Sequence, residues 1–454
     1  MNYKLKLLPL AIAGCIMAAP VAAADNKAAK NTGTVSAQLK SMVILDSADN
    51  GYDPSEGTSY LVKLKYETAS WNNMKVGLGF YNNGDLLNQT DFDKANDSDK
   101  RLARGMFVTD DGSEKSLMGE MYLKYDAGKF GFNAGRQLYD TPLTKITYST
   151  MPNFHTVFGI NTTAVPGLKL SLDQVTQMSF GARAMTDFGL IGEGTQTAGS
   201  VVRPDVIGQA EFHDISLIAT ANDSEETNGI TVLGGTYSGV KGLKISAWDY
   251  YADDISNTFY ADANYGMPVG GLKLKLSAQY LTQSEQGSLV EDNPFLPTGN
   301  FTDGIDYNLF GLKGVVKWKG LMGFLAYNKS SGDTGMFNSW GGDPAYTSSI
   351  FSRNAYRENV SAYKLGVKYS FSKKAFVMLS HADYGQSDSV GRLAGIGNVT
   401  ALTDARETDL VFVVKPMKGL MLKLFHANRT SEYDGSKDNE LTQAHTRFVA
   451  SYKF

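Results

Sequence analysis

The chain has 454 residues, with 47 Gly, 24 Tyr and 23 Phe against 12 Pro and 4 Trp, and a formal net charge of −4 at pH 7. This composition is unusual for soluble domains, and the lack of a basic excess excludes a nucleic-acid footprint. After residue 24, no apolar run approaches the ~20 residues that a membrane-spanning helix needs. An inner-membrane helical protein is therefore excluded as well.

The N-terminus has the pattern of a secretory signal peptide over residues 1–24. Lys4 and Lys6 precede an apolar run over residues 7–19, and the small residues that end at Ala24 have the spacing of a cleavage site. A competing interpretation takes residues 12–15 as a lipoprotein box with Cys15 as the lipidated residue. Cleavage after Ala24 is favoured, and it leaves a mature chain over 25–454 without any cysteine.

Alternation of apolar and polar residues predicts β-strands along the mature chain. In one segment Tyr60, Leu64 and Tyr66 share one parity while Lys63 and Lys65 share the other. Successive side chains of a strand point to opposite faces, so one face meets lipid and the other water. Tyrosines at both ends of the apolar face suit the two interfaces of a membrane. The same pattern recurs over residues 121–125, 272–280 and 363–370.

Connections between the predicted strands alternate between short and long, which favours a barrel over a soluble sandwich. Short turns fall near 71–73, 126–128, 165–167, 238–242, 266–270, 318–320, 371–374 and 416–419. Longer polar stretches cover 82–116, 176–228, 282–304, 329–359, 385–405 and 428–443. We predict an all-β fold: a single transmembrane antiparallel β-barrel of about 18 strands, with short periplasmic turns and long extracellular loops.

Two segments leave this strand count open by two. Residues 206–212 and 215–219 form either another hairpin or part of a loop, and residues 305–316 alternate poorly but are needed as a strand by their neighbours. A barrel of this size leaves an aqueous channel unless something restricts it. The compact polar segment 138–153, which two prolines constrain, is the predicted inward-folded constriction loop.

Four residues are predicted to form the constriction: Arg136, Asp140, Lys145 and Tyr148. Arg136 adjoins the loop, yet strict alternation from Phe130 and Phe132 points its side chain at lipid. A bulge or a strand end must change that direction for Arg136 to reach the pore.

Several motifs around this loop resemble the OprD-type porins. They are Gly135-Arg136-Gln137, Thr141-Pro142-Leu143, Met151-Pro152-Asn153-Phe154, Phe158-Gly159 and Gly341-Gly342-Asp343-Pro344-Ala345-Tyr346-Thr347-Ser348. The resemblance implies a monomeric or trimeric channel of eighteen strands that passes small solutes, often carboxylates, along a row of basic side chains. Residues of lumen parity that could form this row are Lys63, Lys65, Lys169, Lys244, Lys273, Lys275, Lys364, Lys368, Lys423 and Arg447. The alternative is that these lysines are simply water-facing residues.

The sequence shows no motif typical of a metal site or of a catalytic site. Acidic residues cluster in two predicted outer loops, at 91–114 and 432–440, where we interpret them as solvated charges rather than as a cation site. The five histidines are dispersed, and neither His-Glu-x-x-His nor Gly-x-Ser-x-Gly occurs. We therefore predict no enzyme activity, no metal and no cofactor.

The chain ends in an alternating segment in which Phe448, Ala450, Tyr452 and Phe454 share one parity. This ending resembles the signal that the outer-membrane assembly machinery reads, with Phe454 as its terminal residue. The prediction is a bacterial outer-membrane porin in contact with lipid and lipopolysaccharide, passing small hydrophilic solutes by diffusion with a preference for anions. The alternatives are an oligosaccharide-specific channel, with stacking on aromatics such as Trp248, and a surface-binding or adhesive protein that acts through its long loops.

Overall fold

The computed structural model describes residues 33–49, 54–86, 107–109, 112–145, 150–179, 181, 210–220, 226–289, 304–338, 340–350, 352–391, 400–433 and 440–454. The predicted signal peptide with Cys15 lies outside these residues, as do Tyr148 and most of the two acidic loops.

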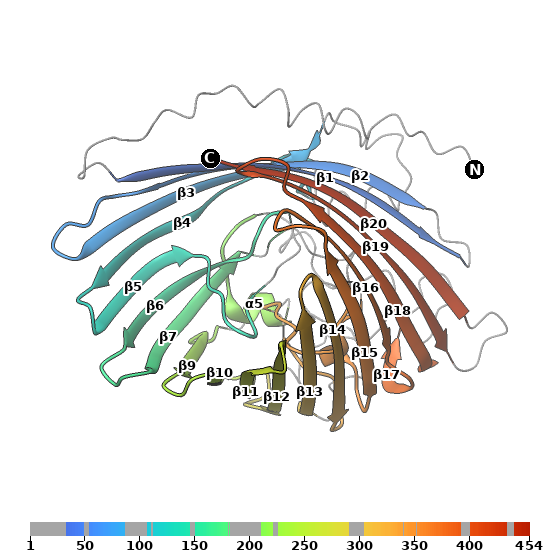
Figure 1. Cartoon of the computed structure of the whole chain (residues 1–454). Helices are drawn as coiled ribbons and strands as arrows, with labels where there is room; N and C mark the ends of the chain where they lie inside the picture. Colours follow the sequence, from blue (N-terminus) through green and yellow to red (C-terminus); the bar gives the residue numbers. More distant parts are fainter. Residues whose placement is uncertain are drawn as a thin grey trace.

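Eighteen antiparallel strands form a closed barrel, which confirms the predicted fold and strand count (Figure 1). Each strand pairs with its neighbour along the chain, and the barrel closes where β1 pairs with β20. The wall strands are β1 (Thr34–Ala48), β2 (Ser55–Glu67), β3 (Met74–Asp85), β4 (Lys115–Asp126), β5 (Phe130–Gln137), β6 (Phe154–Thr162), β7 (Leu168–Ser179), β9 (Ile230–Tyr237), β10 (Leu243–Ala252), β11 (Ser256–Val269), β12 (Leu272–Glu285), β13 (Asp306–Trp318), β14 (Leu321–Ser331), β15 (Ser361–Ser370), β16 (Ala375–Asp383), β18 (Thr400–Val414), β19 (Leu420–Tyr433) and β20 (Glu440–Lys453).

Two short strands extend this wall at its loop end. β8 (His213–Asp214) pairs with the end of β7, and β17 (Ser387–Gly391) pairs with the start of β18. Among the described residues, no helix is long and apolar enough to cross a membrane.

The two faces of the wall differ as the alternation predicts. On β2, Leu64 and Tyr66 are 52% and 43% exposed on the outer face, while the register places Lys63 and Lys65 on the inner face with the buried Leu61. In a membrane the outer apolar side chains contact lipid, and the inner polar face contacts water. The sequence pattern therefore fixes which face of each strand forms the lumen.

Glycines support several of the short connections. Gly167, Gly242 and Gly419 have positive φ angles of 76°, 82° and 83°, a conformation that glycine adopts without steric cost. Seven of the eight predicted short turns lie between the strands where they were expected. The eighth is shifted, because Gly266 belongs to β11 and the chain turns at Gly270 and Gly271.

One of the two uncertain segments is helical rather than extended. Ile215, Ile218 and Ala219 are buried on one side of the short helix α5 (Ile215–Thr220), so the hairpin considered for this region is wrong for its second half. An i, i+3, i+4 spacing of apolar residues suits a helix as well as a short strand, and here tertiary packing decides. The other uncertain segment forms β13 as expected.

Part of the barrel interior has an apolar core. Loop residues Leu143, Phe337, Trp340 and Tyr356 are almost fully buried there and pack with α5 and with inner side chains of the strands. Folding loops inward removes these side chains from water and narrows the lumen. The width of an eighteen-stranded barrel is thereby reduced to a restricted passage.

Candidate functional site: the pore constriction

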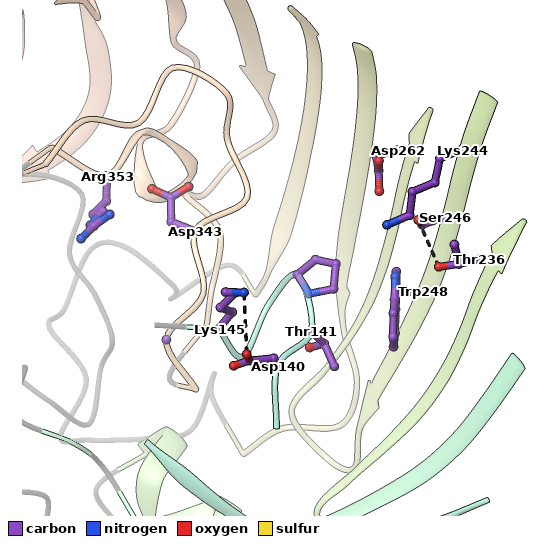
Figure 2. A pocket seen from close by; sticks show the side chains of 12 residues that line it. Asp140, Thr141, Lys145, Thr236, Lys244, Ser246, Trp248, Asp262, Asp343 and Arg353 are labelled. Carbon is purple, nitrogen blue, oxygen red and sulfur yellow. Dashed lines mark hydrogen bonds and ion pairs between the residues drawn. The ribbon is translucent and has the colours of Figure 1, made fainter. Parts of the chain in front are cut away.

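A cavity of about 390 Å³ lies between two inward-folded loops and one wall of the barrel (Figure 2). We call residues 138–153 the first inner loop and residues 332–360 the second inner loop. The cavity is lined by Asp140, Thr141, Pro142 and Lys145 of the first loop, Gly341, Asp343 and Arg353 of the second, and Thr236, Lys244, Ser246, Trp248 and Asp262 of the wall.

The wall side of the cavity is built by the inner faces of β9, β10 and β11. Ser246 of β10 stands opposite Thr236 of β9 and Asp262 of β11, and the Thr236 hydroxyl donates to Ser246 Oγ at 3.2 Å. Lys244 and Trp248 lie two residues to either side of Ser246, so they share its face. Figure 2 shows these side chains on the strands, facing the loops across the cavity.

A compact turn holds the start of the first inner loop. The Thr141 amide donates to Thr144 Oγ1 at 3.0 Å, and the Thr144 hydroxyl donates to the backbone carbonyl of Tyr139 at 2.5 Å. Within this turn Lys145 Nζ lies 3.7 Å from Asp140 Oδ2, and both side chains are more than half exposed. The turn thus presents a charge pair of both signs to the cavity.

Tyr139 fixes this loop to the wall. Its hydroxyl donates to Asp173 Oδ2 at 3.0 Å, and its ring contacts that of His155 at a centroid distance of 5.9 Å. Burial, and then the nearby charge of Asp173, raise the pKa of Tyr139 well above its ordinary value. The hydroxyl therefore stays protonated and remains a donor at any physiological pH.

The two inner loops are joined through the backbone of Leu143. Its carbonyl accepts hydrogen bonds from the Gly342 amide at 2.7 Å and from the Asn338 side chain at 3.0 Å. A Cβ on Gly342 would lie 2.4 Å from the carbonyl carbon of Leu143, so only glycine permits this approach. The loops therefore form one constriction rather than two separate flaps.

The second inner loop is also tied to β14 and β15 of the wall. Asn328 Oδ1 accepts from the amide and hydroxyl of Thr347 at 2.9 and 3.0 Å. Lys364 Nζ donates to the Ser348 carbonyl at 2.9 Å and forms an ion pair of 3.3 Å with Asp409. Because these polar groups are buried, their hydrogen bonds are costly to lose.

A second cavity of about 630 Å³ continues from the first along β4 to β7, β9 and β10. The two share Asp140, Thr141, Thr236 and Trp248, so these four residues line the junction between them. The second cavity reaches the short turn at Asp126 and Gly128, which is the periplasmic end. Together the two cavities extend from the inner loops to the short-turn end of the wall.

The structure distributes the four predicted constriction residues unevenly. Asp140 and Lys145 line the first cavity, whereas Tyr148 lies outside the described residues. Arg136 is paired with Met121 and Thr156, and Met121 is exposed on the outer face, so the register gives Arg136 the lipid-facing parity. Its guanidinium stacks on the ring of Phe212, 4.2 Å from the ring centre, and it lines neither cavity.

All ten basic residues proposed for the row have the lumen parity, but their surroundings differ. Lys63 and Lys65 pair with Glu120, and Lys364 pairs with Asp409. Lys244 lines the first cavity and Lys169 the second. The remaining five basic residues of the predicted row are Lys273, Lys275, Lys368, Lys423 and Arg447.

Sequence reasoning missed Asp262, Asp343 and Arg353 as constriction residues. The alternation of β11 gives Asp262 the lumen parity, so this residue was within reach of the same argument. Asp343 and Arg353 needed the fold of the second inner loop, which strand periodicity does not reveal.

Residues 108–454 match the model of the outer membrane porin, OprD family. The chain belongs to this porin family. No curated protein matches the sequence of this porin.

Solved porins share the fold of this porin at low sequence identity. Pseudomonas aeruginosa OccK1 is 14% identical with a TM-score of 0.68, over 92% of this chain and 98% of that one. Acinetobacter baumannii OccAB4 is 14% identical with a TM-score of 0.68, over 93% and 99% of the two chains. P. aeruginosa OccK2, solved in complex with glucuronate, is 13% identical with a TM-score of 0.65, over 93% and 96%.

Family and fold together make this porin a channel of the bacterial outer membrane for small solutes, in contact with membrane lipid. They point to a channel without enzymatic chemistry.

Proposed function

We propose that this porin passes small hydrophilic solutes by passive diffusion and favours anions, with selection at the cavity between the two inner loops. The proposal rests on how the charges of that cavity are engaged. Asp140 pairs with Lys145, and both oxygens of Asp343 accept hydrogen bonds, from the Ala345 amide at 3.0 Å and the Ser348 hydroxyl at 2.5 Å. The carboxylates of Asp140 and Asp343 are thus already partly compensated by the chain.

Lys244 is the cation that carries the proposal. In the described part of the chain it forms no ion pair, although Asp262 lies close enough to sense its charge. Its side chain reaches into the cavity in Figure 2. An ammonium group in a narrow polar passage attracts anions, and a single weak site still lets them leave. The glucuronate complex of the similar OccK2 agrees with an anionic solute.

Planar-bilayer recording under a salt gradient tests this proposal. The refolded mature chain is expected to conduct with a reversal potential that indicates anion preference. Lys244→Met is expected to lower the anion-to-cation permeability ratio by roughly twofold, because it removes one unit charge from the constriction. Lys241→Met, in the turn before β10, is the matched control and should leave the ratio unchanged. Equal effects of the two variants would contradict the role of Lys244.

A second candidate function, a channel specific for ring-shaped solutes such as oligosaccharides, is favoured by the setting of Trp248. This residue lines both cavities, and its ring lies against Gly234, where an added Cβ would come within 2.3 Å of the ring. Tyr250 stacks beside it at a centroid distance of 6.3 Å. An indole that rests on a glycine offers its other face as an apolar platform for a sugar ring.

Current block by an oligosaccharide tests this second candidate. Maltotriose added to one side is expected to interrupt the ion current of the native channel, and Trp248→Ala is expected to abolish the interruptions while leaving the channel open. Trp318→Ala, at the β13–β14 turn, serves as the control. A native channel that maltotriose does not interrupt would remove the oligosaccharide function and leave the anion channel standing.

We also propose that Phe454 contacts the outer-membrane assembly machinery. The backbone of Phe454 pairs with Ala37 of β1, at 3.1 Å and 3.0 Å in the two directions, and its side chain is half exposed on the barrel exterior.

A further inference from the structure

Away from the constriction, the inner face of β2, β3 and β4 holds a charged network centred on Glu120. The side chain of Glu120 is only 3% exposed. Its Oε1 accepts hydrogen bonds from Lys63 Nζ at 3.1 Å and from the Tyr81 hydroxyl at 2.6 Å, while Lys65 Nζ bonds to Oε2. Neither cavity of the constriction includes these four residues.

A β-bulge turns Glu120 into the lumen. The register between β3 and β4 shifts after Gly79, and two residues of β4, Gly119 and Glu120, lie between the outward-facing Met118 and Met121. Regular alternation would place one residue there. The extra residue moves Glu120 from the outer to the inner parity relative to the start of β4.

Two glycines of β3 make room for the network. A Cβ on Gly79 would lie 2.9 Å from Cβ of Glu120, and a Cβ on Gly77 would lie 2.2 Å from the ring of Tyr122. Because β3 presents no side chain at these two inner positions, the side chains of Glu120 and Tyr122 cross over it. They reach the lysines of β2, where Lys65 Nζ also lies 5.0 Å from the ring centre of Tyr122.

The surroundings of the Glu120 carboxylate have the chemistry of a carboxylate-binding site. Two ammonium groups and a phenolic hydroxyl donate to its two oxygens, and such charge-assisted bonds are among the strongest available to an anion. In this channel, however, a side chain of the chain itself occupies the site. Lys63 and Lys65 are still 18% and 22% exposed, so their charge would otherwise act on the lumen.

We propose that Glu120 is a specificity-determining residue that acts as an internal counter-anion for Lys63 and Lys65. By neutralising these two lysines, Glu120 prevents this wall from binding passing anions. Anions are then attracted mainly by the side of the lumen that carries Lys244. The inference rests on the proposed anion-favouring channel. It adds that the carboxylate of Glu120 neutralises the part of the basic row that lies on β2.

Reversal potentials of Glu120→Gln in planar bilayers test the proposal. Gln keeps the shape and one acceptor oxygen but removes the charge, so the two lysines become uncompensated. We expect the anion-to-cation permeability ratio to rise by about twofold or more. Glu432→Gln loses the same charge at the loop end of β19, outside the network, and is expected to leave the ratio unchanged.

A second test measures block of the Glu120→Gly channel by acetate. A change in net charge alone would not create a binding site for acetate, so this test is independent of the permeability ratio. Removing the side chain vacates the cradle, and millimolar acetate is then expected to reduce the chloride current in a saturable manner. The native channel and the Glu120→Gly, Lys65→Met double variant should not respond.

The two proposals fail in different ways. Conducting channels in which Glu120→Gln leaves the permeability ratio unchanged would overturn the masking role and spare the proposed function. A native channel without anion preference would overturn both. If Glu120→Gly does not refold, the Glu120→Gln permeability ratio alone decides.

Discussion

The two inner loops narrow the same pore in different ways. The first offers exposed charges, Asp140 and Lys145, on a short turn held mainly by its own threonines. The second is buried along much of its length and bonded to β14 and β15, through residues such as Asn328 and Lys364. The comparison indicates that the second loop sets the shape of the constriction, while the first sets part of its charge.

The Asn338 side chain joins the two loops. Of the changes considered, its loss should therefore have the largest effect on how the loops support each other. Asn338→Ala removes the bonds to the carbonyls of Leu143 and Gly342 and leaves both acceptors with one buried partner fewer. We expect a loss of about 1–3 kcal/mol in stability and larger fluctuations of the open-channel current. Thermal unfolding in detergent and single-channel recording measure the two effects.

Asn228→Ala is the matched control, because the Asn228 side chain donates to Asp253 at the exposed surface, outside both inner loops. Equal current noise in the two variants would show that the first loop does not depend on the second.

Glu358 offers a pH test at the end of the second loop. Burial, and then the charges of Asp388 and Asp333, raise the pKa of Glu358 from 4.5 to about 7. Between about pH 4.5 and pH 7, Glu358 is therefore protonated in the folded loop but ionised in the unfolded chain. The stability of the folded loop consequently falls as the pH rises through this range. Protection factors of residues 352–360 against hydrogen exchange, which correct for the base-catalysed rise of the intrinsic exchange rate, are expected to be higher at pH 6 than at pH 8.

Glu358→Gln should remove this part of the pH dependence, because the amide stays neutral across the window. A pH dependence that persists unchanged in the variant would assign it to another group.

The Asp140–Lys145 pair should give the smallest effect on stability. Both side chains are exposed, and exposed ion pairs contribute little. We expect Lys145→Met to change the unfolding free energy by less than about 1 kcal/mol while still shifting the permeability ratio slightly toward cations. A large loss of stability would mean that the first loop is as tightly integrated as the second.

The wall of the barrel was predictable because its physics is local. Alternation fixes the face of each side chain, as for Leu64 and Lys65, and glycines such as Gly167 and Gly242 mark the short turns. For Arg136 the alternation of β5 predicted a lipid-facing side chain, whereas its position next to the loop suggested a pore-facing one. The strand register gives Arg136 the lipid-facing parity, in agreement with the alternation.

The constriction was only half predictable because its contacts are not local. Asn338 and Leu143 are 195 positions apart, and nothing in the periodicity of either loop indicates that they meet. The bulge at Glu120 was likewise hidden, since the residues on either side of it alternate normally. The helix α5 escaped notice because three apolar residues at its spacing also suit a strand.

The closure between β1 and β20 has a consequence for how the protein is made. Gln38 and Ser451 are hydrogen-bonded across 413 positions of the chain. The first strand to leave the ribosome must therefore wait for the last before its free edge is covered, and long-range pairings of this kind form slowly. Until then both edges are open to pairing with other chains, so a carrier that keeps them apart during export would protect the barrel from misassembly.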